Sequence, residues 1–374
     1  MDFKELGRRA LFQTEMLATI LENGEPSPDS EFTDTKRRAL TYPVLDREPI
    51  ADHLNDYTLE EVFYLCYVYH QIVSHADEYP LEQDFYREEA AKVYAYLAAA
   101  LRNAEKVYVI FSSATRHPFI FDHGEKFYAV ASTKEEHVQS MVKLLEEKGL
   151  SINVQEIPGE AFSVFMHSLR FMGLTHVEYG SVDYKTRIKL EDLAEFAVNE
   201  NPSLYIENPS FQQKALMFFQ FINSGMAPQM MQKMEFEMMH EIFTARYILP
   251  SSFDPELLKA EHELSGAVLD RVQFATLENQ EKKAFQPLLT DWVEMNKFNQ
   301  HGQYKALVLE YNDLKKIFPR EGVDAVVFNP MGTNISLTAE QLTALEEKYH
   351  TVLQLMREAR EKGEAEQRNT SEQA

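Results

Sequence analysis

The first part of the chain carries apolar residues at helical spacing. A stripe runs through Leu6–Leu21 and stops before a stretch rich in proline. Residues 26–49 are rich in Pro, Asp, Thr and Ser, and they predict a mobile loop. Thr58 and Glu61 then have the spacing of a capping box that opens the next helix. We therefore predict a helical N-terminal region over residues 1–89, interrupted by one loop.

From Lys106 onward the pattern changes to short apolar runs, typical of strands, and two amphipathic helices. The run at 107–111 is continuously apolar, as in a strand that is buried on both faces. Gly149 and Gly173 follow the two helices and predict their ends. These elements indicate a first mixed-sheet unit over residues 90–200. Its expected strands are residues 107–111, 118–121, 127–131, 152–157, 175–179 and 187–190.

The same order of elements recurs later in the chain. Two Asn-Pro steps within residues 201–209 mark a boundary and helices follow, so residues 201–240 predict a helical connector. Eight elements then match the first unit in order, although few residues are identical between the copies. We interpret the match as an internal duplication, with the second unit over residues 241–352. Its expected strands are residues 245–249, 271–277, 284–286, 304–309, 323–328 and 335–337.

The whole pattern indicates an α+β fold, in which the helical region precedes two related mixed-sheet α/β units. The last predicted helix places Leu342, Leu345 and Tyr349 on one face. Residues 353–374 carry many charges and lack an apolar stripe, so we predict a disordered charged tail there.

Two segments of the second unit have a distinctive order of residues. Residues 287–292 read Pro-Leu-Leu-Thr-Asp-Trp, and residues 327–332 read Val-Phe-Asn-Pro-Met-Gly. They resemble the Pro-x-Phe-Thr-Ser/Asp and hydrophobic-Asn-Pro-hydrophobic-Gly segments of the enhanced-serine-sensitivity (SseB-type) family. The likeness covers about residues 240–350, the first copy at about 90–200 is similar in order only, and residues 1–89 lie outside it. The resemblance implies an SseB-like fold, but no reaction, because the family has no established enzymatic activity.

The composition limits the classes of partner. Acidic side chains outnumber basic ones by 60 to 37, which gives a net charge of −23. This balance opposes binding to nucleic acid and to anionic membranes, and no apolar run reaches the roughly 18 residues of a membrane span. The N-terminus lacks a secretory pattern, and Cys66 is the single cysteine, so a disulfide within the chain is excluded. We predict a cytoplasmic protein with no nucleic-acid partner and no membrane partner.

Motifs for catalysis and for cofactors are missing. The sequence has no glycine-rich nucleotide loop and no nucleophile elbow. His240 and Glu241 begin a zinc motif, but Thr244 occupies the place of its second histidine. We therefore predict no catalytic residue, no cofactor and no metal, and we favour a protein without enzymatic activity.

Histidines and the single cysteine give two weaker groupings. Cys66 and His70 are one helical turn apart, and a packing role is favoured because free cysteines are usually buried and inert. His117 and His123 flank one strand, with Asp122 or His176 as unplaced third candidates, but two ligands do not complete a zinc site. Structural or solvated roles are favoured for both groupings.

Candidate binding residues come from the second unit. Asn329 and Pro330 follow a buried strand, at a place where loops often contact ligands. The favoured alternative is that they only form the turn, since Asn bonds its own backbone and Pro fixes φ. Trp292, the single tryptophan, stands in the first turn of a predicted helix, where it could contact a partner or pack against the core.

A methionine stripe in the connector is a further candidate surface. Met230, Met234 and Met238 follow one another at four-residue steps. Such stripes can adapt to several partners, although packing against a core is the more usual role.

Together these observations predict an SseB-like cytoplasmic protein that binds a protein partner or a small-molecule effector and is linked to amino-acid (serine) sensitivity. One alternative is an enzyme of unrecognised type, with a cleft between the two units. A second alternative is an acidic protein that neutralises a basic effector.

Overall fold

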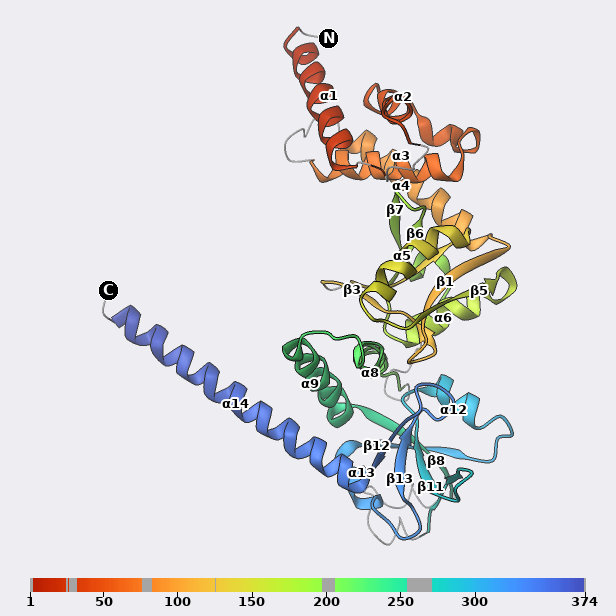
Figure 1. The fold of residues 1–374 in the computed structure, drawn as a ribbon, viewed down its shortest axis with the longest axis vertical. Coiled ribbons are helices and arrows are strands. Elements are labelled where there is room, and N and C mark those ends of the chain that lie inside the picture. The colour runs from red at the N-terminus through yellow and green to blue at the C-terminus, as the bar shows by residue number, and fades with distance from the viewer. Residues whose placement is uncertain are drawn as a thin grey trace. The chain divides into compact units, whose positions relative to one another are not determined.

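A computed structural model describes residues 3–24, 26, 32–75, 83–124, 126–196, 206–253 and 271–372 (Figure 1). The chain divides into two compact units: unit 1 comprises Met1–Arg170 and Leu174–Phe196, and unit 2 comprises Phe171–Gly173 and Ala197–Ala374. Both units combine helices with sheets, so the chain is an α+β protein, as predicted. Residues 1–89 fall within unit 1 and residues 201–240 within unit 2, each with the strands that follow.

Helices form the first half of unit 1. They are α1 (Phe3–Asn23), α2 (Asp34–Leu45), the 3-10 helix η1 (Ile50–Asp56), α3 (Leu59–Ser74) and α4 (Gln83–Arg102). Thr58 and Glu61 form the predicted capping box of α3. The prediction of a mobile loop over residues 26–49 was wrong, because α2 lies within this range. Thr33 caps this helix by accepting a hydrogen bond from the Lys36 amide, and the proline inside the helix stands in its last turn.

The sheet of unit 1 follows these helices. Its strands are β1 (Lys106–Ser112), β2 (His117–Pro118), β3 (Phe121–His123), β4 (Lys126–Ser132), β5 (Ile152–Pro158), β6 (His176–Gly180) and β7 (Lys185–Lys189). Their order is β2-β1-β4-β6-β7, with β5 paired to β1 and β3 paired to β4. β4 and β6 are parallel, whereas β6 and β7 form an antiparallel hairpin. The connecting helices are α5 (Glu135–Glu147), η3 (Gly159–Ala161), α6 (Phe162–Phe171) and α7 (Leu190–Leu193).

Aromatic side chains join the helices of unit 1 to its sheet. Phe63 of α3 lies edge-on against Tyr179 of β6, with ring centroids 4.8 Å apart. Tyr184, in the turn between β6 and β7, packs against Tyr64 and donates a hydrogen bond to the carbonyl of Gly24. These contacts hold the β6–β7 hairpin against α3 and the end of α1.

Unit 2 is built from the same kinds of element. Its helices are α8 (Pro209–Phe221), α9 (Pro228–Thr244), α12 (Trp292–Phe298), α13 (Tyr311–Ile317) and α14 (Ala339–Glu372). Its strands are β8 (Arg246–Ser252), β9 (Gln273–Phe274), β10 (Leu277–Glu278), β11 (Ala284–Leu288), β12 (Lys305–Glu310), β13 (Ala325–Phe328) and β14 (Ile335–Thr338). They form sheets in the orders β10-β11-β13-β14 and β12-β8-β9, and an isolated bridge joins Ile248 to Leu289. Phe211, Tyr247 and Phe328 pack together at the centre of the core.

The strand pairings of unit 1 recur in unit 2. β8 pairs antiparallel with β9 and β12, as β1 does with β2 and β5. β11 pairs in parallel with β13 and antiparallel with β10, as β4 does with β6 and β3. The hairpin of β13 and β14 repeats the hairpin of β6 and β7. The order of elements that recurs in the sequence therefore corresponds to one scheme of strand pairing in both units.

The C-terminal segment is helical, where disorder was expected from residue 353. α14 continues from Ala339 to Glu372. Leu342 and Tyr349 are buried, whereas the described side chains after Leu353 are exposed. Strong helix formers and pairs spaced by one turn sustain this exposed part without a core. None of the helices in the described ranges combines the length and apolarity that a membrane crossing requires.

Candidate functional site

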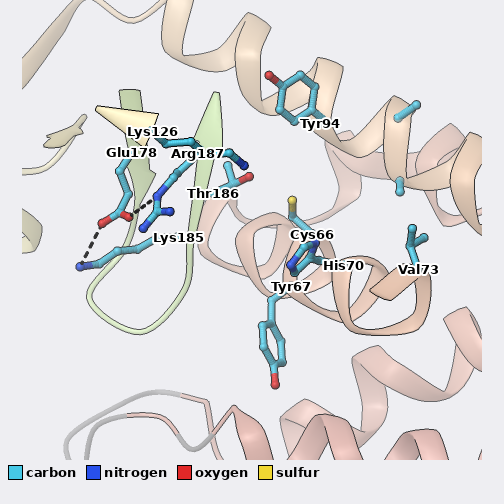
Figure 2. A pocket seen from close by; sticks show the side chains of 12 residues that line it. Cys66, Tyr67, His70, Val73, Tyr94, Lys126, Glu178, Lys185, Thr186 and Arg187 are labelled. Atoms are coloured by element: carbon cyan, nitrogen blue, oxygen red, sulfur yellow. Dashed lines mark hydrogen bonds and ion pairs between the residues drawn. The ribbon is translucent and has the colours of Figure 1, made fainter. Parts of the chain in front are cut away.

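A pocket of about 560 Å³ lies in unit 1, between α3 and α4 on one side and β4, β6 and β7 on the other (Figure 2). This volume is within the range of small-molecule sites. The helices contribute Cys66, Tyr67, His70, Val73, Ala90, Ala91 and Tyr94. The strands contribute Lys126, Glu178, Lys185, Thr186 and Arg187. We call these two sets the helix wall and the strand wall.

On α3 the pocket residues stand beside the residues that face the core. Cys66, His70 and Val73 are spaced by about one turn, so they share one side of the helix. Burial raises the pKa of the Cys66 thiol, and a hydrogen bond with Thr186 opposes this shift only in part. A thiol that stays protonated is a poor nucleophile, so Cys66 forms part of the helix wall without being reactive.

Tyr94 of α4 supplies an aromatic surface to the helix wall. Its hydroxyl donates to Asp192 Oδ2 at 2.7 Å and accepts from the Lys189 amide at 2.9 Å. Because the hydroxyl proton is already donated to Asp192, Tyr94 offers the pocket its ring and no further hydrogen-bond donor. Ala90 and Ala91 of the same helix add methyl groups, so this part of the helix wall is apolar.

The strand register places the charged residues of the strand wall. Glu178 of β6 lies directly opposite Arg187 of β7. Arg187 Nε donates to Glu178 Oε2 at 3.2 Å, and the guanidinium lies 4.3 Å from the centre of the Tyr128 ring. Gly180 permits the tight turn beside this pair, since a Cβ there would lie 2.5 Å from the Tyr184 carbonyl oxygen. Arg187 is therefore held in position without any ligand.

The strand wall carries more positive than negative charge. Lys185 and Arg187 share the single carboxylate of Glu178, at 3.9 and 3.2 Å. Lys126 has no ion pair among the residues that the structure describes. The pKa of nearby His176 is lowered first by burial and then by cations that include Lys126 and Arg187. Uncompensated positive charge therefore gathers at this pocket, in a chain whose net charge is −23.

A contact between a serine and a histidine lies elsewhere in unit 1. Ser132 Oγ is 3.0 Å from His137 Nδ1, but its hydroxyl donates to the Gly180 carbonyl at 3.0 Å. Because the hydroxyl proton is already used, the His137 ring donates to Ser132 and cannot act as its base. Ser132 is also only 2% exposed. The pair therefore supports the fold and does not form a nucleophile.

The histidines considered as metal ligands do not come together with a third ligand. His117 Nδ1 lies 2.7 Å from the Thr115 carbonyl oxygen, and His176 Nδ1 lies 2.7 Å from Thr175 Oγ1. His123 is exposed. Over the described ranges, no group of three or more His, Cys, Asp or Glu residues could hold a metal ion.

Asn329 lies in a buried polar network of unit 2. Its side-chain oxygen accepts from the Thr290 amide at 2.9 Å, and its side-chain nitrogen donates to Thr290 Oγ1 at 2.7 Å. Thr290 Oγ1 in turn donates to Asp291 Oδ2, which also accepts from Gln212. The network fixes the end of β13 to the start of α12, where Asp291 caps the helix. Asn329 is 0% exposed, and a binding role for it stays a prediction.

Pro330 and Trp292 lie next to this network and are partly exposed. Trp292 is the first residue of α12 and packs against a small cluster that includes Ile248 and Met295. The structure thus gives Trp292 a packing contact. Both residues belong to unit 2, so they are not part of the unit 1 pocket.

The methionine stripe of Met230, Met234 and Met238 does not stay on one face of α9. Met230 is 48% exposed, Met234 is half-buried and Met238 is 5% exposed. Steps of four residues drift by roughly 40° in a helix of 3.6 residues per turn, so the stripe passes from solvent into the core. Met238 therefore packs inside unit 2, and a partner surface here is limited to the first part of the stripe.

Comparisons with known proteins give only distant likenesses. No protein-family model matches the chain, and no curated protein matches it. Tic22 from Plasmodium falciparum is 13% identical over 68% of this chain and 98% of its own, with a TM-score of 0.16. Anabaena Tic22 (protein transport) is 12% identical over 63% of this chain and 91% of its own, with a TM-score of 0.15. At TM-scores this low the likeness supports no argument about the chain.

The pocket was not identified from the sequence. Lys185, Arg187 and Lys189 alternate along β7 with a period of two, which places three cations on one strand face. This alternation could have indicated the charged face of the pocket. The strand expected at 187–190 leaves out Lys185, so the alternation of three cations was not recognised. In the helix wall, the sequence singles out Cys66 and His70, one turn apart, and both line the pocket. Their position opposite the strand wall depends on the packing of α3 against β7, which the sequence pattern does not show.

Proposed function

We propose that this chain is an SseB-type effector-binding protein without enzymatic activity, and that the unit 1 pocket is its ligand site. The pocket itself carries the proposal: it joins a helix wall with an apolar part, formed by Val73, Ala90, Ala91 and the Tyr94 ring, to a charged strand wall. Arg187 is already fixed there by Glu178 and Tyr128. Binding sites commonly combine a preformed apolar cavity with a few oriented polar groups.

The groups that could react in or near the pocket favour binding without reaction. The raised pKa of the Cys66 thiol keeps it protonated, and the Tyr94 hydroxyl is used by α7 and β7. Of the two partner classes expected from the sequence, a small effector is therefore the one that the geometry favours.

The SseB-like character and the link to amino-acid (serine) sensitivity belong to this proposal. They are supported by the motifs at 287–292 and 327–332 and by the pairing scheme that both units share. We propose that the two units are tandem copies and that unit 1 carries the effector site.

A ligand screen with a blocked pocket tests the proposal. Ala91 is exposed and lines the pocket, so Ala91→Trp fills the space without disturbing the core. Ala95 is also exposed on α4 but does not line the pocket, and Ala95→Trp is the matched control. We expect a panel of amino acids including L-serine, organic acids and phosphate esters to contain a compound that raises the melting temperature of the native chain. Its affinity should fall at least about tenfold in Ala91→Trp only.

Two results would contradict the proposal. A compound that binds the native chain and both variants equally well has its site elsewhere in the molecule. A panel without any stabilising compound, with all three proteins folded by circular dichroism, removes the support for a small effector.

A further inference from the structure

The charges of the strand wall restrict what can bind in the pocket. Three cations, Lys126, Lys185 and Arg187, and a single carboxylate, that of Glu178, line the strand wall. Glu178 is 12% exposed and lies between Arg187 and Lys185. Lys126 stands apart from this group, with no ion pair in the described part of the chain. A ligand that brings negative charge would balance the excess, with Lys126 and Lys185 as the donors still able to turn toward it.

A positively charged group on the ligand would find no uncommitted carboxylate among the residues that line the pocket. The single lining carboxylate is taken by two cations, and the Tyr94 hydroxyl is used by Asp192 and Lys189. An ammonium group would also lie among like charges, which costs binding free energy. This argument disfavours free amino acids, whose ammonium group is next to the carboxylate.

The helix wall indicates the rest of the ligand. Val73, Ala90, Ala91 and the ring of Tyr94 form a surface that offers apolar contact opposite the cations. Figure 2 shows Lys126 and Arg187 on the strands and Tyr94 on the facing helix. A ligand that uses both walls has a charged end and an apolar end.

We infer that the unit 1 pocket takes an oxyanion, either a carboxylate or a phosphate monoester, carried on a short apolar body without an ammonium group. The inference rests on the proposed function and names its ligand class. Within that function, the effector is an acid without an ammonium group, so serine itself is disfavoured in the pocket.

Four probes of one shape test the ligand class by calorimetry on the full chain. They are 3-phenylpropionate, 2-phenylethyl phosphate, 3-phenylpropan-1-ol and L-phenylalanine. We expect the carboxylate and the phosphate to bind at least about tenfold more tightly than the alcohol, which lacks the anion, and than L-phenylalanine, which adds the ammonium group. Their relative affinities distinguish a carboxylate site from a phosphate site. Binding of both acids should weaken as salt is added.

Lys126→Gln separates the charge from the shape of the pocket. It should weaken both acids about tenfold and leave the alcohol unchanged. Lys143→Gln is the matched control, because Lys143 is an exposed lysine on α5 outside the pocket, and it should change nothing.

The outcomes separate the ligand class from the proposed function. The inference would be overturned if the alcohol binds as tightly as the acids, or if Lys126→Gln leaves the affinity of the acids unchanged. The proposed function would still stand in these cases, provided that Ala91→Trp blocks binding. Tight binding of L-phenylalanine would overturn the exclusion of an ammonium group. If the wider panel supplies a ligand that Ala91→Trp blocks but none of the acids binds, the ligand class falls and the proposed function stands. If the panel also supplies no ligand, both the ligand class and the proposed function are contradicted.

Discussion

Asn329 illustrates how a single buried polar side chain stabilises unit 2. Its φ of 46° lies in the left-handed region, and its amide satisfies both the N–H and the hydroxyl of Thr290. Asn329→Ala leaves the buried Thr290 N–H without its acceptor and removes one donor to the Thr290 hydroxyl, which keeps Asp291 and Gln212 as partners. It also keeps the strained backbone. We expect the free energy of unfolding to fall by roughly 2–4 kcal/mol, measured by chemical denaturation of the full chain.

Asn334 provides the matched control for this prediction. It has a similar φ of 51° but is exposed and makes no side-chain hydrogen bond within the described residues. Asn334→Ala should therefore cost only about 1 kcal/mol, from backbone conformation alone. Equal losses at the two positions would show that the turn, and not the network, accounts for the effect of Asn329.

Single residues were the hardest feature to predict from the sequence. The Asn-Pro order at residue 329 correctly pointed to a turn after a buried strand, but the bonds to Thr290 depend on contacts across 39 residues. Likewise, Lys126 and Arg187 meet in the pocket only because β4 and β6 are parallel neighbours and β7 lies beside β6. Local patterns contain the strands, but the order of strands in the sheet decides which side chains come together.

At the level of elements, α2 depends on one buried arginine. Arg37 is 1% exposed, and its guanidinium donates to the carbonyls of Ile20 and Leu21 near the end of α1. It thereby satisfies acceptors that a helix leaves open at its C-terminus. Arg37→Met keeps most of the volume but takes the guanidinium donor from the Leu21 carbonyl, whereas the Ile20 carbonyl still accepts from the Tyr67 hydroxyl. We expect it to lower the free energy of unfolding by roughly 1–3 kcal/mol.

The neighbouring Arg38 is exposed, so Arg38→Met is the control and should change the free energy of unfolding by less than about 0.5 kcal/mol. Hydrogen exchange on α2 should also accelerate in Arg37→Met alone. Equal stability of the two variants would contradict an anchoring role for Arg37.

The elements that could be predicted are those whose own sequence shows a regular spacing of apolar residues and signals for where the element begins and ends. β1, β5 and α5 lie close to their expected bounds, because apolar spacing and a following turn or glycine define them. α2 was missed because its composition resembles a loop, and what supports it is the cap at Thr33 and the contacts of Arg37. The end of α14 was predicted to be disordered because it lacks an apolar stripe. An exposed helix does not need such a stripe when its residues are strong helix formers.

At the level of the whole molecule, each unit has a core of its own. Leu65 is 0% exposed in unit 1, and Leu249 is 0% exposed in the core of unit 2. Because contacts cluster within each unit, we expect calorimetry of the full chain to resolve two unfolding transitions. Leu65→Ala should lower one of them and Leu249→Ala the other, each by roughly 4–20 °C, from a loss of about 2–5 kcal/mol per cavity.

The same measurement locates the ligand site. A compound that binds in the unit 1 pocket should raise only the transition that Leu65→Ala lowers, because a ligand stabilises the unit to which it binds. Ala91→Trp should remove this shift and leave the transition of unit 2 unchanged. One transition that both leucine variants lower together would show instead that the two units unfold cooperatively, and a ligand in unit 1 would then stabilise the whole chain.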